Sequence, residues 1–281
     1  MSFFTPFAFI KSEVTAPVPF SGLLDEYPGA YGAFSLRKLS STYTGSALMV
    51  RRASDNAEQA IGFVNNELDV TTLESFCAGT NGFVTTWYNQ TGNGVDAFMT
   101  QSAKQPQIVS GSNVIEVNSK PAIFWGSGDV MATSDYILEF SANSVSAFVV
   151  KGISTTGGGY LLNEGDNLAV STNVSIGGLN GSNILWVNST VIGTMPSGQV
   201  LVGVDKVVGA NPYITYTNGT FNASGSATTN AEVGNRTMIG GRVDYEGLFT
   251  GYQQEIITYK FDNSSNRAGI DSNINTYYSI Y

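Results

Sequence analysis

Short apolar runs separated by turn residues recur through most of this 281-residue chain and constrain its fold most strongly. Over residues 168–176, Leu, Val, Thr or Ile occupies every second position, the period of a strand with one buried face. Asn218-Gly219 is a strong hairpin signal. The pattern predicts an all-β fold, a two-sheet antiparallel jelly-roll sandwich. Further candidate strands are 47–52, 82–88, 107–110, 122–125, 144–151, 184–187, 199–204, 213–217, 237–242 and 247–260.

Helical spacing is confined to three short stretches. Residues 30–39 place Phe34, Leu36 and Leu39 on one side and Arg37 and Lys38 outward, which predicts a helix. Asp69 or Thr71 can cap a second helix over 72–78. At the end of the chain, residues 264–281 predict an amphipathic helix that packs on the sandwich. Its apolar face comprises Ile270, Ile274, Tyr277, Tyr278 and Tyr281.

Residues 1–25 differ from the remainder, which we expect to form one domain over 26–281. Pro6, Pro17 and Pro19 exclude a helix or a central strand there and leave an extended arm. An arm rich in phenylalanine cannot bury these side chains on itself, so it lies across its own domain or docks on another copy or protein. The residues expected to anchor it are Phe3, Phe4, Phe7 and Phe9.

Composition excludes several classes of function. The net charge of −9 leaves no basic footprint for nucleic acid. The chain has no histidine, which rules out a histidine-based triad and histidine metal ligands. Its single cysteine, Cys77, lies in an apolar run and is expected to be a buried, inert thiol.

The sequence also lacks signals for the membrane and for secretion. No stretch reaches the ~18 continuous apolar residues of a membrane helix, so we expect no membrane insertion. The aromatic N-terminus has no basic start and is interrupted by Pro6, unlike a signal peptide. We therefore expect synthesis in a cytoplasm and, if the protein acts outside, release by another route.

A charged cluster lies at residues 51–58. Arg51, Arg52, Asp55 and Glu58 can neutralise one another and pin a loop to the sandwich, which is the interpretation we favour. The same arginines could instead clamp a carboxylated sugar. A calcium site built from Asp55, Asn56 and Glu58 is a third alternative, although the spacing matches no known calcium loop. We expect no other metal or cofactor.

Aromatic residues next to polar loops are candidates for glycan binding, because an aromatic face packs on sugar C–H bonds while amides bind hydroxyls. Trp87 ends an apolar strand and is expected in the core. Trp186 follows an Asn/Gly/Ser-rich loop and is the better candidate. The predicted glycan-binding set is Trp186, Tyr160, Glu164 and Asp166.

Several motifs occur in a fixed order over roughly the first third of the domain. They resemble the catalytic domain of fungal-type α-L-arabinofuranosidase B, and still more the concanavalin A-like (laminin-G-like) modules of bacteriophage and marine bacterial proteins. The resemblance implies a jelly-roll sandwich. The motifs include Ser35-Leu36-Arg37-Lys38-Leu39, Val50-Arg51-Arg52, Phe83-Val84-Thr85-Thr86-Trp87-Tyr88 and Gly92-Asn93-Gly94.

The resemblance also indicates where hydrolytic chemistry would lie. Glycoside hydrolysis needs two carboxylates across the scissile bond. In the arabinofuranosidase family both lie in the second half of the domain, near a vicinal cysteine pair, whereas the corresponding region here is Gly157-Gly158-Gly159. Neither family position holds an evident acid. Glu164 with Glu232 is the pair to test, and Asp166 lies beside the first.

These observations predict a non-enzymatic structural protein of a bacteriophage particle: a capsid decoration, head-fibre or tail-associated subunit. Residues 1–25 would bind other virion proteins or further copies of the chain, and the protein would reside in the virion. The first alternative is a carbohydrate-binding module for host surface glycans. The second is an α-L-arabinofuranosidase-like glycoside hydrolase.

Overall fold

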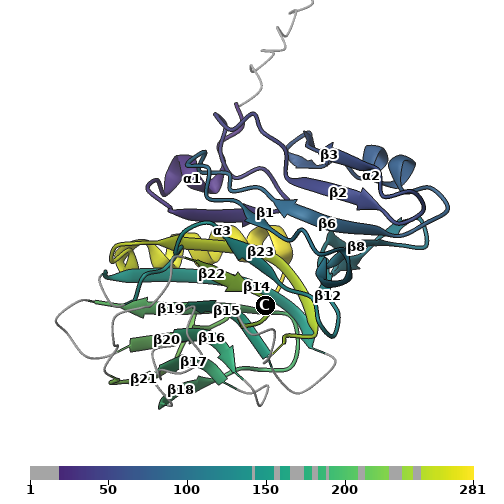
Figure 1. Cartoon of the computed structure of the whole chain (residues 1–281). Coiled ribbons are helices and arrows are strands. Elements are labelled where there is room, and N and C mark those ends of the chain that lie inside the picture. Colours follow the sequence, from purple (N-terminus) through teal and green to yellow (C-terminus); the bar gives the residue numbers. More distant parts are fainter. Residues whose placement is uncertain are drawn as a thin grey trace, which may run out of the picture.

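The computed structural model describes residues 19–140, 143–154, 159–164, 174–178, 183–187, 190–207, 213–227, 236–242 and 248–281. Apart from two separate hairpins, its strands form one hydrogen-bonded network that folds into two packed layers with a wing beside them (Figure 1). Every ladder between the named strands is antiparallel, so the predicted two-sheet antiparallel sandwich with short helices and a C-terminal helix is confirmed. The helices are α1 (Leu23–Glu26), α2 (Val70–Phe76) and α3 (Arg267–Tyr278), with 3₁₀ turns at Ser102–Lys104 and Ser264–Asn266.

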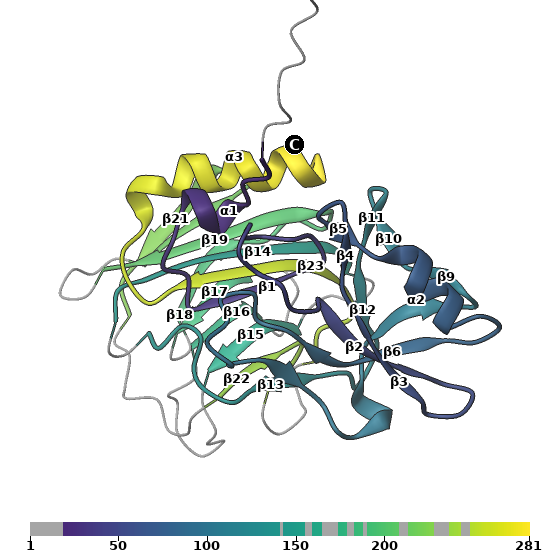
Figure 2. The same ribbon diagram turned by 90° about the horizontal axis from the view of Figure 1, so that it is seen from above.

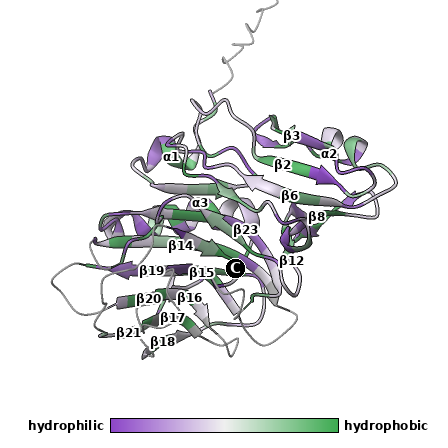
Figure 3. Ribbon diagram, viewed as in Figure 1, coloured by the Kyte–Doolittle hydropathy of each residue, from purple (hydrophilic) through white to green (hydrophobic). Residues whose placement is uncertain are grey.

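The first layer is centred on two long strands that pair with each other, β14 (Val145–Ser154) and β23 (Gly251–Tyr259). Figure 3 shows hydrophobic residues along both. On one side β23 pairs with two short strands, and on the other β14 leads to a hairpin. The outer members are β1 (Gly32–Ser35), β12 (Ile123–Trp125), β19 (Val200–Lys206), β20 (Tyr213–Thr217) and β21 (Thr220–Gly225).

The second layer runs from the wing to the far edge in the order β7, β13, β22, β15, β16, β17, β18. At the far edge the Asn222 side chain bonds both the N–H and the C=O of Thr194, which links β18 to β21 of the first layer. The strands are β7 (Ala97–Phe98), β13 (Met131–Thr133), β15 (Gly159–Glu164), β16 (Val174–Gly178), β17 (Asn183–Val187), β18 (Thr190–Thr194) and β22 (Thr237–Ile239).

The wing connects the two layers through β6 (Gly82–Trp87), which pairs with β7 and β8 along one edge and with β2 along the other. Helix α2 covers the wing, and Asp69 caps it by accepting a hydrogen bond from the Thr72 N–H at 3.0 Å, as predicted. The other wing strands are β2 (Leu48–Arg52), β3 (Glu58–Ile61), β8 (Gln107–Ser110) and β9 (Asn113–Val114), with two small hairpins, β4 (Phe63–Val64)–β5 (Glu67–Leu68) and β10 (Glu116–Val117)–β11 (Lys120–Pro121).

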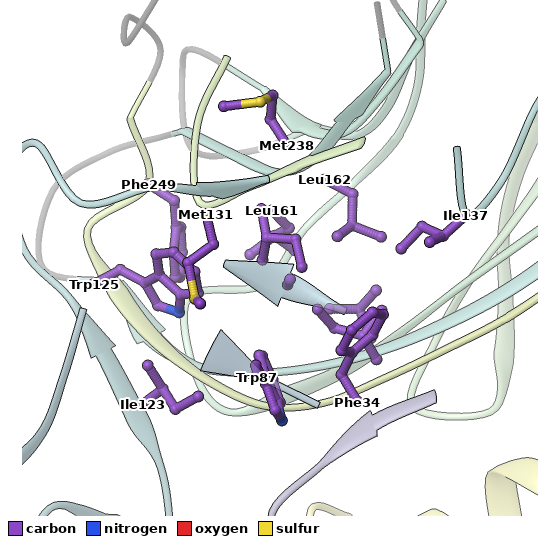
Figure 4. Close-up of a cluster of buried hydrophobic side chains, with 14 of the residues drawn as sticks. Phe34, Trp87, Ile123, Trp125, Met131, Ile137, Leu161, Leu162, Met238 and Phe249 are labelled. Atoms are coloured by element: carbon purple, nitrogen blue, oxygen red, sulfur yellow. The ribbon is translucent and has the colours of Figure 1, made fainter. Parts of the chain in front are cut away.

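The main core lies between the layers and extends under the wing (Figure 4). Trp87 is fully buried and packs edge-on against Phe34, with ring centroids 5.8 Å apart, as its place in an apolar strand predicted. Cys77 is also buried, and burial raises the pKa of its thiol. Each layer contributes fully buried aliphatic side chains, among them Val149, Val202 and Ile256 from the first and Leu162, Ile176 and Ile239 from the second.

Helix α3 lies across the outer face of the first layer (Figure 2). Ile270, Ile274 and Tyr278 pack on Phe148 and Ile257, and all are buried. The predicted closing helix is therefore confirmed. Within the described ranges no helix has both the length and the apolar character needed to cross a bilayer.

The helix predicted at residues 30–39 is wrong, because this segment contains β1. Ala33 faces the cluster under α3 and Phe34 faces the main core, so both sides of the strand are apolar and the period of two is hidden. The segment is fixed by amides from further along the chain. Asn89 Oδ1 accepts from the Ala33 N–H at 2.9 Å, and Gln90 Oε1 accepts from the Leu39 N–H at 2.8 Å.

Candidate functional site

Glu164 ends β15 and lies in the interior of the second layer. Its register partners are Val174 and Thr237, and none of the three is more than 1% exposed. The carboxylate accepts three hydrogen bonds, from the N–H groups of Leu138 and Glu139, each at 2.8 Å, and from the Thr237 hydroxyl at 2.9 Å. Three donors match an acceptor-only ionised carboxylate. Glu164 thus holds the turn at residues 138–139 against β15 and β22.

Asn163 points to the opposite side of the strand from Glu164, because successive strand residues alternate between faces. It is directly opposite Ser175 on one neighbouring strand and Met238 on the other. Its Nδ2 donates to Ser175 Oγ at 2.7 Å, but among the described residues no donor reaches its Oδ1, although the side chain is fully buried. An unpaired buried amide oxygen is costly and marks a position suited to a hydrogen-bonding ligand.

The cross-strand alignment of Met238, Asn163 and Ser175 continues to the predicted glycan-binding residues. Trp186 is opposite Ser175 in the register of β16 and β17. Tyr160, on β15, is opposite Gly177 and only 4% exposed. Asp166 and Glu232 lie outside the described residues. The face of the second layer opposite to that of Glu164 is therefore the candidate site, and we name the aligned register positions Met238, Asn163, Ser175 and Trp186 the polar row. Sequence reasoning selected Trp186 but missed Asn163, because only strand pairing brings them together.

The charged cluster separates into two parts. Arg52 binds Asp55 through two hydrogen bonds, at 3.0 and 2.6 Å, and also donates to the Phe76 carbonyl. These contacts lower the pKa of Asp55 to about 2. Arg51 instead contacts amide oxygens, those of Gln105 at 2.7 Å and Asn56 at 2.9 Å. Glu58 is exposed and lies opposite Arg51 in the β2–β3 register.

The oxygens considered for calcium are thus directed at guanidinium groups: those of Asp55 at Arg52 and that of Asn56 at Arg51. Across the described ranges, no three His, Cys, Asp or Glu side chains gather as metal ligands. The predicted anchoring residues Phe3, Phe4, Phe7 and Phe9 lie outside the described part of the chain.

Comparisons with known proteins agree with this fold. The family model for the catalytic domain of α-L-arabinofuranosidase B matches residues 28–125. Two similar solved structures are a GH54 α-L-arabinofuranosidase soaked with a cyclic sulfate inhibitor (TM-score 0.67, 15% identity) and an arabinofuranosidase complexed with arabinofuranosyl-α-1,2-xylobiose (TM-score 0.65, 16% identity). Each match covers 90% of this chain but only 64% of the solved chain. No curated protein sequence matches.

These findings correct the predicted function. The prediction of a non-enzymatic bacteriophage structural protein, with its virion and capsid assignments, is wrong, because the matched family model is that of a catalytic domain and the similar structures are arabinofuranosidases. The second alternative fits better. The motifs of the wing and β1 carried the correct signal, and the chain is related to the catalytic domain of α-L-arabinofuranosidase B.

Proposed function

We propose that this chain is an arabinofuranosidase-like glycoside hydrolase domain that acts on α-L-arabinofuranosides. The observation that carries the proposal is the agreement of fold over 90% of the chain with GH54 arabinofuranosidases, together with the catalytic-domain match at residues 28–125. One of those enzymes was soaked with 4-nitrophenyl α-L-arabinofuranoside, which supplies a direct test substrate.

The topology of the second layer supports a location at one end of the layer for the two carboxylates that hydrolysis requires. Glu164 is opposite Thr237, so the chain leaves β15 and enters β22 at the same end of the layer. Asp166 follows β15 by two residues, and Glu232 precedes β22 by five. Both acids therefore belong to segments attached at this end. Glu164 itself is enclosed by the contacts described above, so we assign it a structural role in supporting the site.

The test is release of 4-nitrophenol by the full chain and by three variants, Asp166→Asn, Glu232→Gln and Glu164→Gln. We expect the first two to lose at least about 100-fold in kcat while keeping the melting temperature, since each removes an acid or nucleophile. Glu164→Gln should lower the melting temperature. The exposed Glu116→Gln is the matched control and should change neither. Full activity in both Asp166→Asn and Glu232→Gln would contradict this assignment.

A second candidate is glycan binding without cleavage. It is favoured by Glu164, the acid best defined at this end of the layer, which is buried and whose carboxylate accepts hydrogen bonds from the Leu138 and Glu139 N–H groups and the Thr237 hydroxyl. Calorimetric titration with arabinofuranosyl-substituted xylobiose separates the two. Binding with no detectable turnover would support the module, whereas turnover abolished by the acid variants would support the hydrolase.

A further inference from the structure

A separate cavity lies beside the β4–β5 hairpin, and Figure 2 shows this hairpin well apart from β15 and β22. Its volume is about 370 Å³, within the usual range of small-molecule sites. None of the side chains that line it is acidic. The polar ones are Lys38, Tyr43, Thr44, Ser46, Asn65 and Asn66.

The two asparagines are held on a rigid turn. Asn65 and Asn66 are the only residues between β4 and β5, and their φ angles of 51° and 68° give the left-handed two-residue turn that Asn tolerates. The Lys38 N–H donates to the Asn66 carbonyl at 2.8 Å, which ties the turn to the segment that follows β1. The side-chain amides therefore have a fixed backbone beneath them.

Tyr43 also lines the cavity and is equally constrained. Its hydroxyl donates to the Ser46 carbonyl at 2.9 Å, and its ring packs edge-on against Phe63 at 6.4 Å. A Cβ on Gly45 would lie only 2.5 Å from the Tyr43 hydroxyl, so a larger residue there would displace the Tyr43 side chain. Burial, followed by the charge of Asp96, raises the pKa of Tyr43 to about 12 and keeps it a neutral donor.

The lining matches the chemistry of a sugar. Amides and hydroxyls offer both donors and acceptors to ring hydroxyls, and Lys38, whose ammonium also donates to the Ser41 carbonyl at 3.3 Å, carries the one charge among the lining side chains. We propose that this cavity is an accessory glycan-binding site for one sugar unit, with preference for a unit that carries a carboxylate. The site goes beyond the proposed hydrolase function and does not depend on it.

The probes are methyl β-D-glucuronide and methyl β-D-glucoside, which differ only at the C6 carboxylate. Each is titrated into ¹⁵N-labelled full-length chain and followed by amide NMR shifts. We expect saturable shifts at residues 38, 43–46 and 62–66, with the glucuronide binding several-fold more tightly. Absence of saturable shifts at these residues with about 50 mM of either ligand, well above a Kd of about 1 mM, would overturn the proposal.

Two variants test the assignment of roles. Asn65→Gly removes an amide but keeps the left-handed turn, and should weaken both ligands by about two- to tenfold, the effect of one hydrogen bond. Lys38→Met should reduce the affinity for the glucuronide to that for the glucoside. Val64→Thr, in the same hairpin but outside the cavity, is the control and should bind like the parent. Unchanged affinity in Asn65→Gly, or a retained glucuronide preference in Lys38→Met, would contradict the proposal.

Discussion

The outer face of the first layer and the face of the second layer that carries the polar row differ in what they leave unpaired. On the first layer, α3 covers a face with two buried ion pairs: Arg37 makes two hydrogen bonds to Glu255, each at 2.8 Å, and Arg267 binds Asp205, while the buried Asp271 makes no hydrogen bond among the described residues. On the second layer the polar row is neutral, and Asn163 keeps an amide oxygen that accepts nothing among the described residues. The comparison teaches that one face is closed by its own chain and the other is suited to a ligand.

The largest effect should come from opening the closed face. Glu255→Gln leaves the Arg37 guanidinium, 8% exposed, without its charge partner. Because removal of one partner from a buried ion pair leaves an uncompensated charge, we expect the free energy of unfolding to fall by about 3–5 kcal/mol. Urea denaturation measures it, with Glu116→Gln as control. A loss below about 1 kcal/mol would show that this face is not held by the pair.

A smaller effect, an increase in the free energy of unfolding, is expected from a substitution at Asp271. Its carboxylate makes no hydrogen bond among the described residues and lies 3.9 Å from Arg267. Burial raises its pKa to about 6 from 3.8. The folded state therefore binds the extra proton, and stability is lost as pH rises from about 4 to 6. Asp271→Asn should raise the free energy of unfolding at pH 7 by about 2–3 kcal/mol and flatten this pH dependence. A destabilised variant at pH 7 would contradict the assignment.

Lys151, within the first layer's β14, should make the stability depend on pH with the opposite sign. It is 2% exposed, donates to the Gly198 carbonyl at 3.1 Å, and burial lowers its pKa to about 8 from 10.5. The unfolded chain binds the extra proton, so stability should rise with pH above 8, by about 2 kcal/mol at pH 9.5. The difference from Lys151→Met, followed by urea midpoints from pH 7 to 9.5, isolates this contribution. An unchanged difference would mean that the lysine stays charged.

The smallest effect on stability, and the most informative for function, concerns the polar row. Asn163→Ala loses one hydrogen bond to Ser175 and should cost about 1 kcal/mol or less. If this face binds the substrate, affinity for arabinofuranosyl-substituted xylobiose should fall by at least about tenfold. Gln199→Ala, which removes an amide from the first layer, should leave affinity unchanged. Equal effects of the two substitutions would remove the distinction between the faces.

The sequence predicted elements whose signals are local. The Asp69 cap, the Asn218-Gly219 turn and the closing helix depend on neighbouring residues and were predicted correctly. Arg37 was expected to point outward, because its partner Glu255 lies 218 residues further along the chain. The same limit applies to the candidate site. Trp186 was selected from the polar loop that precedes it in the sequence, which is a local signal. The orientations of Glu164 and Asn163 follow from the pairing of β15 with β16 and β22, which is not local.

The position of β23 has a consequence for biosynthesis. This strand, near the C-terminus, pairs with β1, β12 and β14, all of which are made much earlier. Such a high contact order means that the nascent chain cannot complete its first layer until residues 251–259 have left the ribosome. Until then β1 and β14 have exposed edges, and a chain truncated before residue 251 would be a substrate for aggregation or proteolysis rather than a smaller working domain.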